Sequence, residues 1–134
     1  MEKSFIHSRI IQVKNDHLDA LLHVNNVQYL HWMMESAEEH WQIRAPKDMY
    51  EQFVWVVRKH QIEYTGQAIA GNNLLLKTWT GESSGACWWR HFTMEQQATG
   101  TGIIKAATQF VLVNRQTGKP QPIRSNIISI FQNA

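Results

Sequence analysis

The sequence has little cysteine, little proline and no long apolar run: one cysteine, three prolines and no hydrophobic segment of membrane-spanning length among 134 residues. A single cysteine, Cys87, excludes an internal disulfide, and its neighbours GACWWRHF favour a packed thiol in a reducing compartment. The N-terminal stretch MEKSFIHSRIIQVKNDH lacks the apolar core of a signal peptide or a membrane span. We therefore expect a cytoplasmic protein without a membrane partner.

The sequence also lacks a large excess of positive or negative charge. The net charge is +2, and the lysines and arginines are scattered along the chain. Nucleic-acid-binding domains usually carry a basic stripe with interleaved aromatic residues, so we expect no nucleic-acid partner. Seven histidines are present, but none forms a helical pair with an acidic partner or a zinc-like spacing with cysteine. The sequence therefore predicts no metal site and no cofactor.

The length and the pattern of apolar residues predict one domain over residues 1–134. Residues 5–13 form a first strand, and a polar loop follows it. A long helix comes next, because one group of apolar residues recurs at helical spacing. That group is Val27, Leu30, Met34, Ala37 and Trp41, widened by Tyr29 and Met33. Asn25 or Asn26 is expected to cap this helix, and Pro46 to end it.

Beyond about residue 52 the chain is rich in β-branched and aromatic residues. The expected strands lie within 53–65, 73–82, 87–97, 102–115 and 122–130, separated by turns that contain glycine or proline. Since no helix is expected between these strands, we predict an antiparallel meander. The fold class is then α+β, with a curved antiparallel sheet wrapped around one long central helix.

One short motif in the sequence resembles the signature of a known protein family. The run from Asp19 to Tyr29 contains Asp, three residues, His-Val-Asn-Asn, two residues and Tyr. It resembles the signature of hotdog-fold acyl thioesterases of the 4-hydroxybenzoyl-CoA thioesterase-like group. It is also similar to the plant acyl-acyl-carrier-protein (acyl-ACP) thioesterases, whose Trp, Glu and Ser are matched by Trp32, Glu35 and Ser36. The resemblance implies a hotdog fold and an acyl thioester of CoA or acyl carrier protein as the substrate.

The sequence departs from that pattern at three positions. Leu22 stands where the family usually has glycine. The plant enzymes have an Asn two residues before the motif histidine and an acidic residue within the segment matching 64–68. Here those positions hold Leu21 and Gln67. What remains is a simpler site with one carboxylate and a helix N-terminus.

The resemblance assigns roles to seven residues. Asp19 is the general base or the nucleophile, a backbone N–H at Asn26 contacts the oxyanion, and His23 completes the catalytic group. The expected substrate-binding residues are Asn25, Tyr29, Leu21 and Gln67. Structural interpretations compete with these roles: Asp19 as a loop carboxylate bonded to a backbone amide, Asn25 and Asn26 as helix caps, and Tyr29 as a core residue.

Two other functions stay open on the sequence. One is a hotdog protein that binds acyl thioesters without hydrolysing them. The other is a hotdog dehydratase, whose sites resemble a histidine paired with an acidic residue on the helix. The nucleotide of CoA would need basic surface residues, for which Arg58, Lys59, Arg90 and Arg124 are candidates.

Four tryptophans in the expected strands give information on the oligomeric state. A half-wrapped sheet carrying Trp55, Trp79, Trp88 and Trp89 would expose aromatic area in a monomer. Trp88 and Trp89 are consecutive and should face opposite sides of a strand. We therefore expect a homo-oligomer, a dimer or a tetramer built of dimers, with the active site between subunits as in hotdog proteins.

Overall fold

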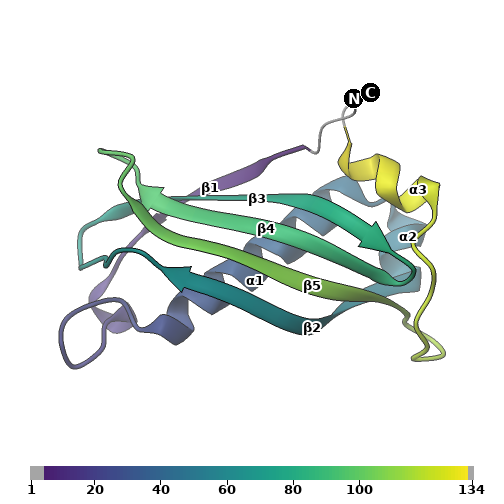
Figure 1. The fold of residues 1–134 in the computed structure, drawn as a ribbon, viewed down its shortest axis with the longest axis horizontal. Helices are drawn as coiled ribbons and strands as arrows, with labels where there is room; N and C mark the ends of the chain where they lie inside the picture. The colour runs from purple at the N-terminus through teal and green to yellow at the C-terminus, as the bar shows by residue number, and fades with distance from the viewer. Residues whose placement is uncertain (1–4, 133–134) are drawn as a thin grey trace.

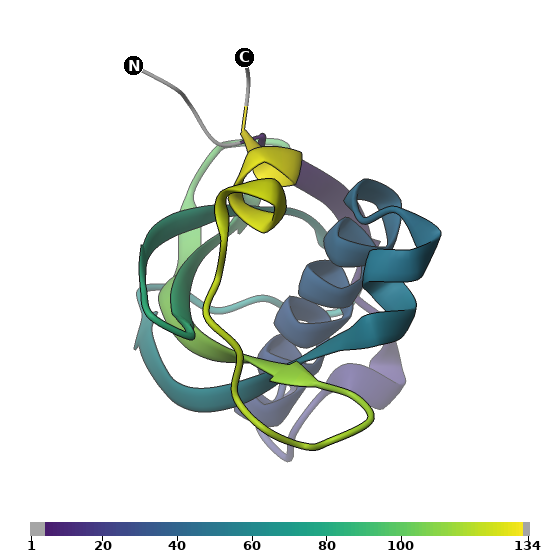
Figure 2. The ribbon, with the colours of Figure 1, turned by 90° about the vertical axis from the view of Figure 1, so that its right-hand side faces the viewer.

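A five-stranded antiparallel sheet curves around the long helix α1 (Asn26–Arg44) in the computed structural model, which describes residues 5–132 (Figure 1). The strands are β1 (His7–Gln12), β2 (Phe53–Tyr64), β3 (Asn73–Ser84), β4 (Cys87–Gln96) and β5 (Gly102–Asn114). Viewed along the helix, the sheet wraps one side of α1 (Figure 2). The predicted hotdog architecture is confirmed.

The order of the strands departs from a simple meander. Strands β3, β4 and β5 are consecutive neighbours, as predicted, but the sheet order is β1-β3-β4-β5-β2. Strand β2 does not pair with β3; it pairs with β5, from Phe53 opposite Asn114 to Tyr64 opposite Ile104. The edge of β3 that faces away from β4 is taken by β1, so β2 has to cross to the far edge.

Helix α1 begins and ends where the sequence predicts. The Asn25 side chain accepts a hydrogen bond from the Val27 amide at 2.9 Å, which caps the helix, and the helix stops at Arg44, two residues before Pro46. Its buried face is rotated from the predicted stripe, because Val27 is 59% exposed. The buried residues of α1 are Tyr29, Trp32, Met33, Ser36, Ala37, His40 and Trp41. Two of them are polar, so apolar spacing alone misplaced the centre of this face.

The predicted last strand at 122–130 is wrong. This segment forms the short helix α3 (Ser125–Ile128) and the 3₁₀ turn η2 (Ser129–Phe131). Ile127 and Phe131 lie four residues apart, the spacing of one helical face, and both are buried against Trp41, Trp88 and Leu112. The segment closes one end of the space between sheet and helix. Two further elements were not predicted: η1 (Asn15–His17) and α2 (Lys47–Gln52).

The two consecutive tryptophans of β4 point to opposite faces, as predicted. Trp88 is 3% exposed, and its indole N–H donates to the Gly81 carbonyl at 2.8 Å. Trp89 is half-buried on the outer face, where the Lys59 ammonium lies 5.3 Å from its ring centre. Among residues 5–132, no helix has both the length and the apolar character needed to cross a membrane.

Candidate active site

A tight turn at 19–23 holds the motif carboxylate beside the start of α1. Leu18 and Val24 form a single β-bridge, and the Asp19 amide donates to the His23 carbonyl at 2.7 Å. The Leu22 amide in turn donates to the Asp19 carbonyl at 3.0 Å. This closure forces Leu22 into the left-handed region with φ of 62°. The glycine that the resembling family has at this position is thereby explained.

The Asp19 side chain is oriented by the same turn. Its Oδ1 accepts hydrogen bonds from the Leu21 amide at 2.8 Å and the His23 amide at 3.2 Å. These bonds agree with the structural interpretation, in which Asp19 is a loop carboxylate bonded to a backbone amide. They are also compatible with a catalytic role for the carboxylate. The second oxygen, Oδ2, accepts no hydrogen bond from any residue within 5–132. One oxygen therefore fixes the carboxylate, and the other is available to a water or a substrate.

Replacing Leu22 by glycine tests the strain in this turn. Leu22 adopts the left-handed region, which costs an L-residue roughly 1–2 kcal/mol that glycine does not lose. We expect Leu22→Gly to raise the free energy of unfolding by about 1 kcal/mol, after the extra entropy of glycine in the unfolded chain is subtracted. Chemical denaturation measures the change.

Leu21→Gly is the matched control for that substitution. Leu21 is 75% exposed, and Leu22 is the only non-glycine residue among 5–132 with a positive φ. Leu21→Gly should therefore lower stability by roughly 0.5–1 kcal/mol, the usual entropic cost of glycine. Equal destabilisation by both substitutions would contradict strain at Leu22.

The segment that follows β2 packs against this turn. The Val24 amide donates to the Ala68 carbonyl at 2.9 Å, which fastens the motif loop to residues 65–70. That segment is held in turn by β5, since the Thr65 and Gly66 amides both donate to the Ile103 carbonyl, at 2.9 and 3.3 Å. A Cβ on Gly66 would lie 2.6 Å from the Gly102 carbonyl oxygen, so glycine permits the close approach.

These two segments and the first turns of α1 enclose an open cleft of about 630 Å³. Its lining is Asp19, Leu21, His23, Val24, Asn26, Tyr29, Tyr64, Thr65, Gly66 and Gln67. Six of the seven predicted site residues are therefore brought together, although they come from positions up to 48 residues apart, Asp19 to Gln67. The exception is Asn25, whose carboxamide caps the helix instead of lining the cleft.

Sequence reasoning missed Tyr64 and Thr65. It identified the segment 64–68 only as the place of a missing acidic residue. The Tyr64 ring is 46% exposed and lies 6.1 Å from the Tyr29 ring, so two phenols form one wall of the cleft. The signal in the sequence that could have identified Tyr64 is an aromatic residue at the end of an expected strand.

Hydrogen-bond donors converge on the cleft. The Asn26 amide, in the first turn of α1, has no intrahelical acceptor and bonds to no other residue of 5–132, whereas the Val27 and Gln28 amides bond to Asn25. The Tyr29 hydroxyl is buried without a hydrogen-bond partner in the described chain, although the Ala68 backbone is near enough to affect its titration. Burial raises the pKa of Tyr29, so the phenol stays protonated and can donate.

The cleft holds no preformed catalytic dyad. His23 and Asp19 are joined through the backbone, and no hydrogen bond links the imidazole to the carboxylate. No group of three or more His, Cys, Asp or Glu side chains within 5–132 has the geometry of a metal site. The chemistry that this arrangement allows is therefore carried by one carboxylate, helix-entrance amides and phenol donors.

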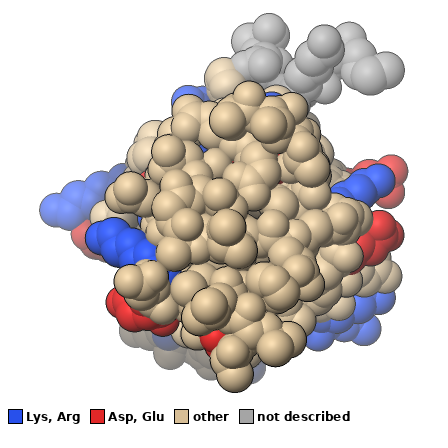
Figure 3. Space-filling view, turned by 90° about the vertical axis from the view of Figure 1, so that its left-hand side faces the viewer, with Lys and Arg blue, Asp and Glu red and all other residues tan. Residues whose placement is uncertain are grey.

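The end of the molecule that carries the N-terminus of α1 is largely free of Lys, Arg, Asp and Glu, which gather around its rim (Figure 3). None of the four basic candidates for the CoA nucleotide lines the cleft. The interpretation of Arg90 as surface charge is wrong, because this residue is 6% exposed and bonds to His40 in the interior. Arg58, Lys59 and Arg124 are exposed.

Comparison with known sequences gives a family match over almost the whole chain. Residues 6–131 match the acyl-ACP thioesterase N-terminal domain family. The chain is 26% identical over 92 residues to the chloroplastic acyl-[acyl-carrier-protein] hydrolase FATB3 of Cuphea viscosissima. That match covers 66% of this chain and 22% of the relative. The chain thus corresponds to about a fifth of the plant protein.

Solved structures show the same fold at low identity. The 12:0-ACP thioesterase from Umbellularia californica is 17% identical with a TM-score of 0.81, and the match covers 96% of this chain and 51% of that one. A 1,4-dihydroxy-2-naphthoyl-CoA thioesterase from Synechocystis is 16% identical with a TM-score of 0.80, covering 94% and 95%. The first is about twice as long as this chain, and the second is nearly equal in length.

Proposed function

Because this chain belongs to the family of the acyl-ACP thioesterase N-terminal domain, we propose that it hydrolyses an acyl thioester of CoA or acyl carrier protein to a free acid and a thiol. The observation that carries the proposal is the cleft in which Asp19, the Asn26 amide and Tyr29 meet. The two structural relatives support both carriers, since one is named for an ACP substrate and the other for a CoA thioester.

Hydrolysis needs a nucleophile for the thioester carbonyl and a donor for the oxyanion that forms. Asp19 supplies the first, either by removing a proton from an attacking water or by attacking through Oδ2 and releasing the acid by later hydrolysis. The Asn26 amide supplies the second, aided by the positive end of the α1 dipole. The carbon–sulfur bond then breaks, and the leaving thiolate takes up a proton.

Other cleft residues receive positioning roles in this proposal. The Tyr29 hydroxyl is a protonated donor that can contact the thioester or a bound water. Leu21 is 75% exposed although apolar, which fits a wall that an acyl group covers. His23 and Gln67 supply polar side chains at the mouth. Asn25 acts through the helix that it caps.

A thiol-release assay tests the function. Purified protein is offered a panel of acyl-CoA and acyl-ACP thioesters of different chain length, and free thiol is measured. Release that depends on Asp19 is the expected result. Tight binding of thioesters without release would support the non-catalytic binder. A dehydratase is less well supported, because the histidine–carboxylate pair between β1 and α1, His7 with Glu39, lies outside the cleft.

We further propose a dimer in which the β2 edges of two copies meet. Strand β2 ends the sheet and has 12 residues, whereas the other edge strand, β1, has 6. An unpaired edge of this length is a template for a second strand.

Substitutions on the two edge strands test that dimer. Val56 on β2 and Ile10 on β1 are both 49% exposed, so they form a matched pair. We expect sedimentation to give the mass of two chains for the wild type and for Ile10→Asp, and of one chain for Val56→Asp, because the latter would place two carboxylates in one interface. A single-chain mass for the wild type at micromolar concentration would refute the dimer.

A further inference from the structure

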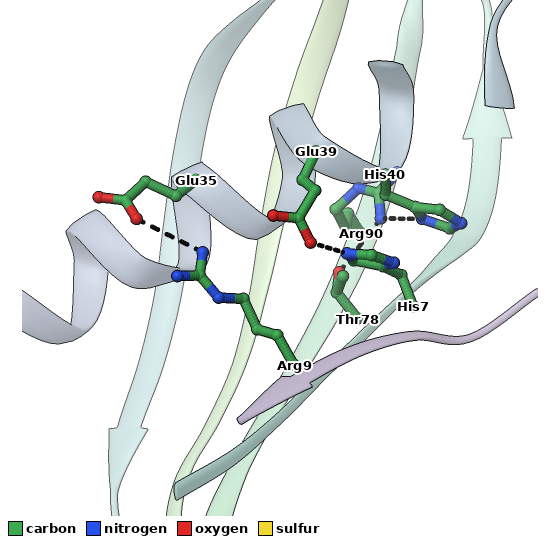
Figure 4. Close-up of polar contacts among 7 residues, drawn as sticks. All are labelled: His7, Arg9, Glu35, Glu39, His40, Thr78 and Arg90. Carbon is green, nitrogen blue, oxygen red and sulfur yellow. Dashed lines mark hydrogen bonds and ion pairs between the residues drawn. The ribbon is translucent and has the colours of Figure 1, made fainter. Parts of the chain in front are cut away.

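A buried cation lies between α1 and the inner face of the sheet, away from the cleft. Arg90 of β4 is 6% exposed, and its Nη1 donates to His40 Nδ1 at 2.9 Å and to Thr78 Oγ1 at 3.2 Å (Figure 4). Its guanidinium carbon is 5.2 Å from the centre of the Phe131 ring. Neither Nε nor Nη2 of Arg90 hydrogen-bonds to a residue of the described chain.

This cation has no carboxylate partner. Arg90 forms no ion pair with an Asp or Glu among residues 5–132, and the nearby acidic residues of α1 are engaged elsewhere. Glu39 Oε1 lies 2.5 Å from His7 Nε2, and Glu35 pairs with Arg9 at 3.4 Å (Figure 4). A buried charge is normally paired, because removing it from water without a counter-charge is costly.

The surroundings of Arg90 are electropositive. Burial, followed by electrostatic interactions with Arg90, His7 and Arg44, lowers the pKa of His40 to about 3. His40 is therefore neutral, and its Nδ1 accepts the arginine hydrogen bond. Burial lowers the pKa of Arg90 to about 9, so the guanidinium remains positive at neutral pH. An anion entering this region would meet one fixed positive charge and no opposing carboxylate on the sheet.

Arg90 is one of the residues that line a cavity of about 180 Å³. We call it the Arg90 pocket; it is lined by Met34, Ala37, Glu38, Trp41, Trp55, Val57, Thr80, Trp88, Trp89, Arg90, Phe110 and Phe131. An apolar cavity of about 150 Å³ in a protein core is known to hold a benzene molecule. The Arg90 pocket is therefore large enough for a small hydrophobic body, with aromatic walls and one strong donor.

One carboxylate borders the pocket, at its solvent side. Glu38 is exposed, and its Oε1 accepts a hydrogen bond from the Tyr50 hydroxyl at 2.5 Å. Water screens its charge far more than it screens that of the buried Arg90. A ligand can thus place an anionic group at the guanidinium and keep its apolar part against the tryptophans.

The Arg90 pocket is separate from the Asp19 cleft. The two linings share no residue. Along α1, Tyr29 is the last residue of the cleft and Met34 the first residue of the pocket. They are separated by roughly 7.5 Å at the helical rise of about 1.5 Å per residue. A ligand in one site therefore does not directly occupy the other.

We propose that the Arg90 pocket binds a small hydrophobic carboxylic acid, with its carboxylate on the free Nε and Nη2 donors of Arg90. A planar guanidinium matches a carboxylate with two parallel hydrogen bonds, which a neutral group cannot reproduce. The proposal does not depend on hydrolysis, since it concerns a different site. Should the chain hydrolyse thioesters, the acids it releases belong to the same chemical class.

Binding of octanoate and of its neutral isostere octanamide tests this proposal. Tryptophan fluorescence reports on the site, because Trp41, Trp55 and Trp88 line it, and calorimetry gives the dissociation constants. We expect octanoate to bind at least about tenfold more tightly than octanamide, as for a charge-assisted hydrogen bond. Arg90→Met should abolish that preference, whereas Arg124→Met, at an exposed arginine, should leave it unchanged.

A second variant keeps the test decisive if Arg90→Met does not fold. Ala37 is 7% exposed and lines the pocket, so Ala37→Leu should fill it and weaken octanoate about tenfold or more while retaining the guanidinium. Asp19→Asn should bind octanoate like the wild type, which separates this site from the proposed hydrolysis. Equal affinity of the wild type for octanoate and octanamide, no binding of octanoate at millimolar concentration, or a preference that survives Arg90→Met would overturn the proposal.

Discussion

Asp19→Asn is expected to lower hydrolysis of the best thioester by at least about a hundredfold, the scale of losing a positioned base or nucleophile. The substitution removes the negative charge of the carboxylate and keeps the size of the side chain. An asparagine carbonyl oxygen can accept the same two hydrogen bonds that Oδ1 receives from the Leu21 and His23 amides, so the turn should keep its shape. Thiol release measured under saturating and limiting substrate separates the turnover number from kcat/KM.

Asp16→Asn is the matched control for that experiment. Asp16 lies three residues earlier in the same loop, and its side chain is 83% exposed. Removing its charge should change turnover by less than about twofold, since an exposed carboxylate is screened by water. Near wild-type turnover in Asp19→Asn would refute the proposed mechanism. A large loss in both variants would point to the charge of the loop as a whole.

Trp41→Ala is expected to have the largest effect on stability. Trp41 is 2% exposed, and its ring lies 5.5 Å from that of Trp55 and 6.2 Å from that of Phe131. Removing a buried tryptophan leaves a cavity that the surroundings fill only in part, and costs about 3–5 kcal/mol. For a domain of this size the midpoint of thermal unfolding should fall by roughly 10–20 °C. Denaturant unfolding at fixed protein concentration measures the free energy.

Trp79→Ala provides the same chemical change on the other face of the sheet. Trp79 is half-buried, and its ring stacks on His91 with a centre-to-centre distance of 5.7 Å. We expect a loss of about 1 kcal/mol, as for a cross-strand aromatic pair on a partly exposed surface. Similar losses for the two tryptophans would contradict a core that lies between α1 and the concave face.

Local signals in the sequence predicted most elements correctly. Asn25 caps α1, and Pro46 follows its end, because capping and proline geometry act within one helical turn. The β-branched and aromatic segments became β2 to β5. The exception was the C-terminal segment, in which Ile127 and Phe131 sit at helical spacing but were assigned to a strand. There the apolar run was too short for its period to be recognised.

A sequence motif predicted the residues of the candidate site, but it did not predict how the two walls of the cleft come together. Asp19, His23, Asn26 and Tyr29 are close in sequence, so their proximity follows from one turn and one helix entrance. The opposite wall, with Tyr64 and Gln67, reaches the motif because β2 pairs with β5 and the next segment is fastened to Val24. Nothing in the local pattern specifies that pairing.

By itself, the sequence determined the helix, its capped start, the strand segments and the turn that carries Asp19, since each depends on neighbours a few residues away. Only the tertiary structure decided the edge position of β2 and the burial of Arg90 and His40. On a strand whose residues alternate between the two faces of the sheet, an arginine is expected to be a surface charge as long as the helix that faces it is unknown. Its burial depends on which residues of α1 meet β4 across the core, and that contact joins positions 50 residues apart.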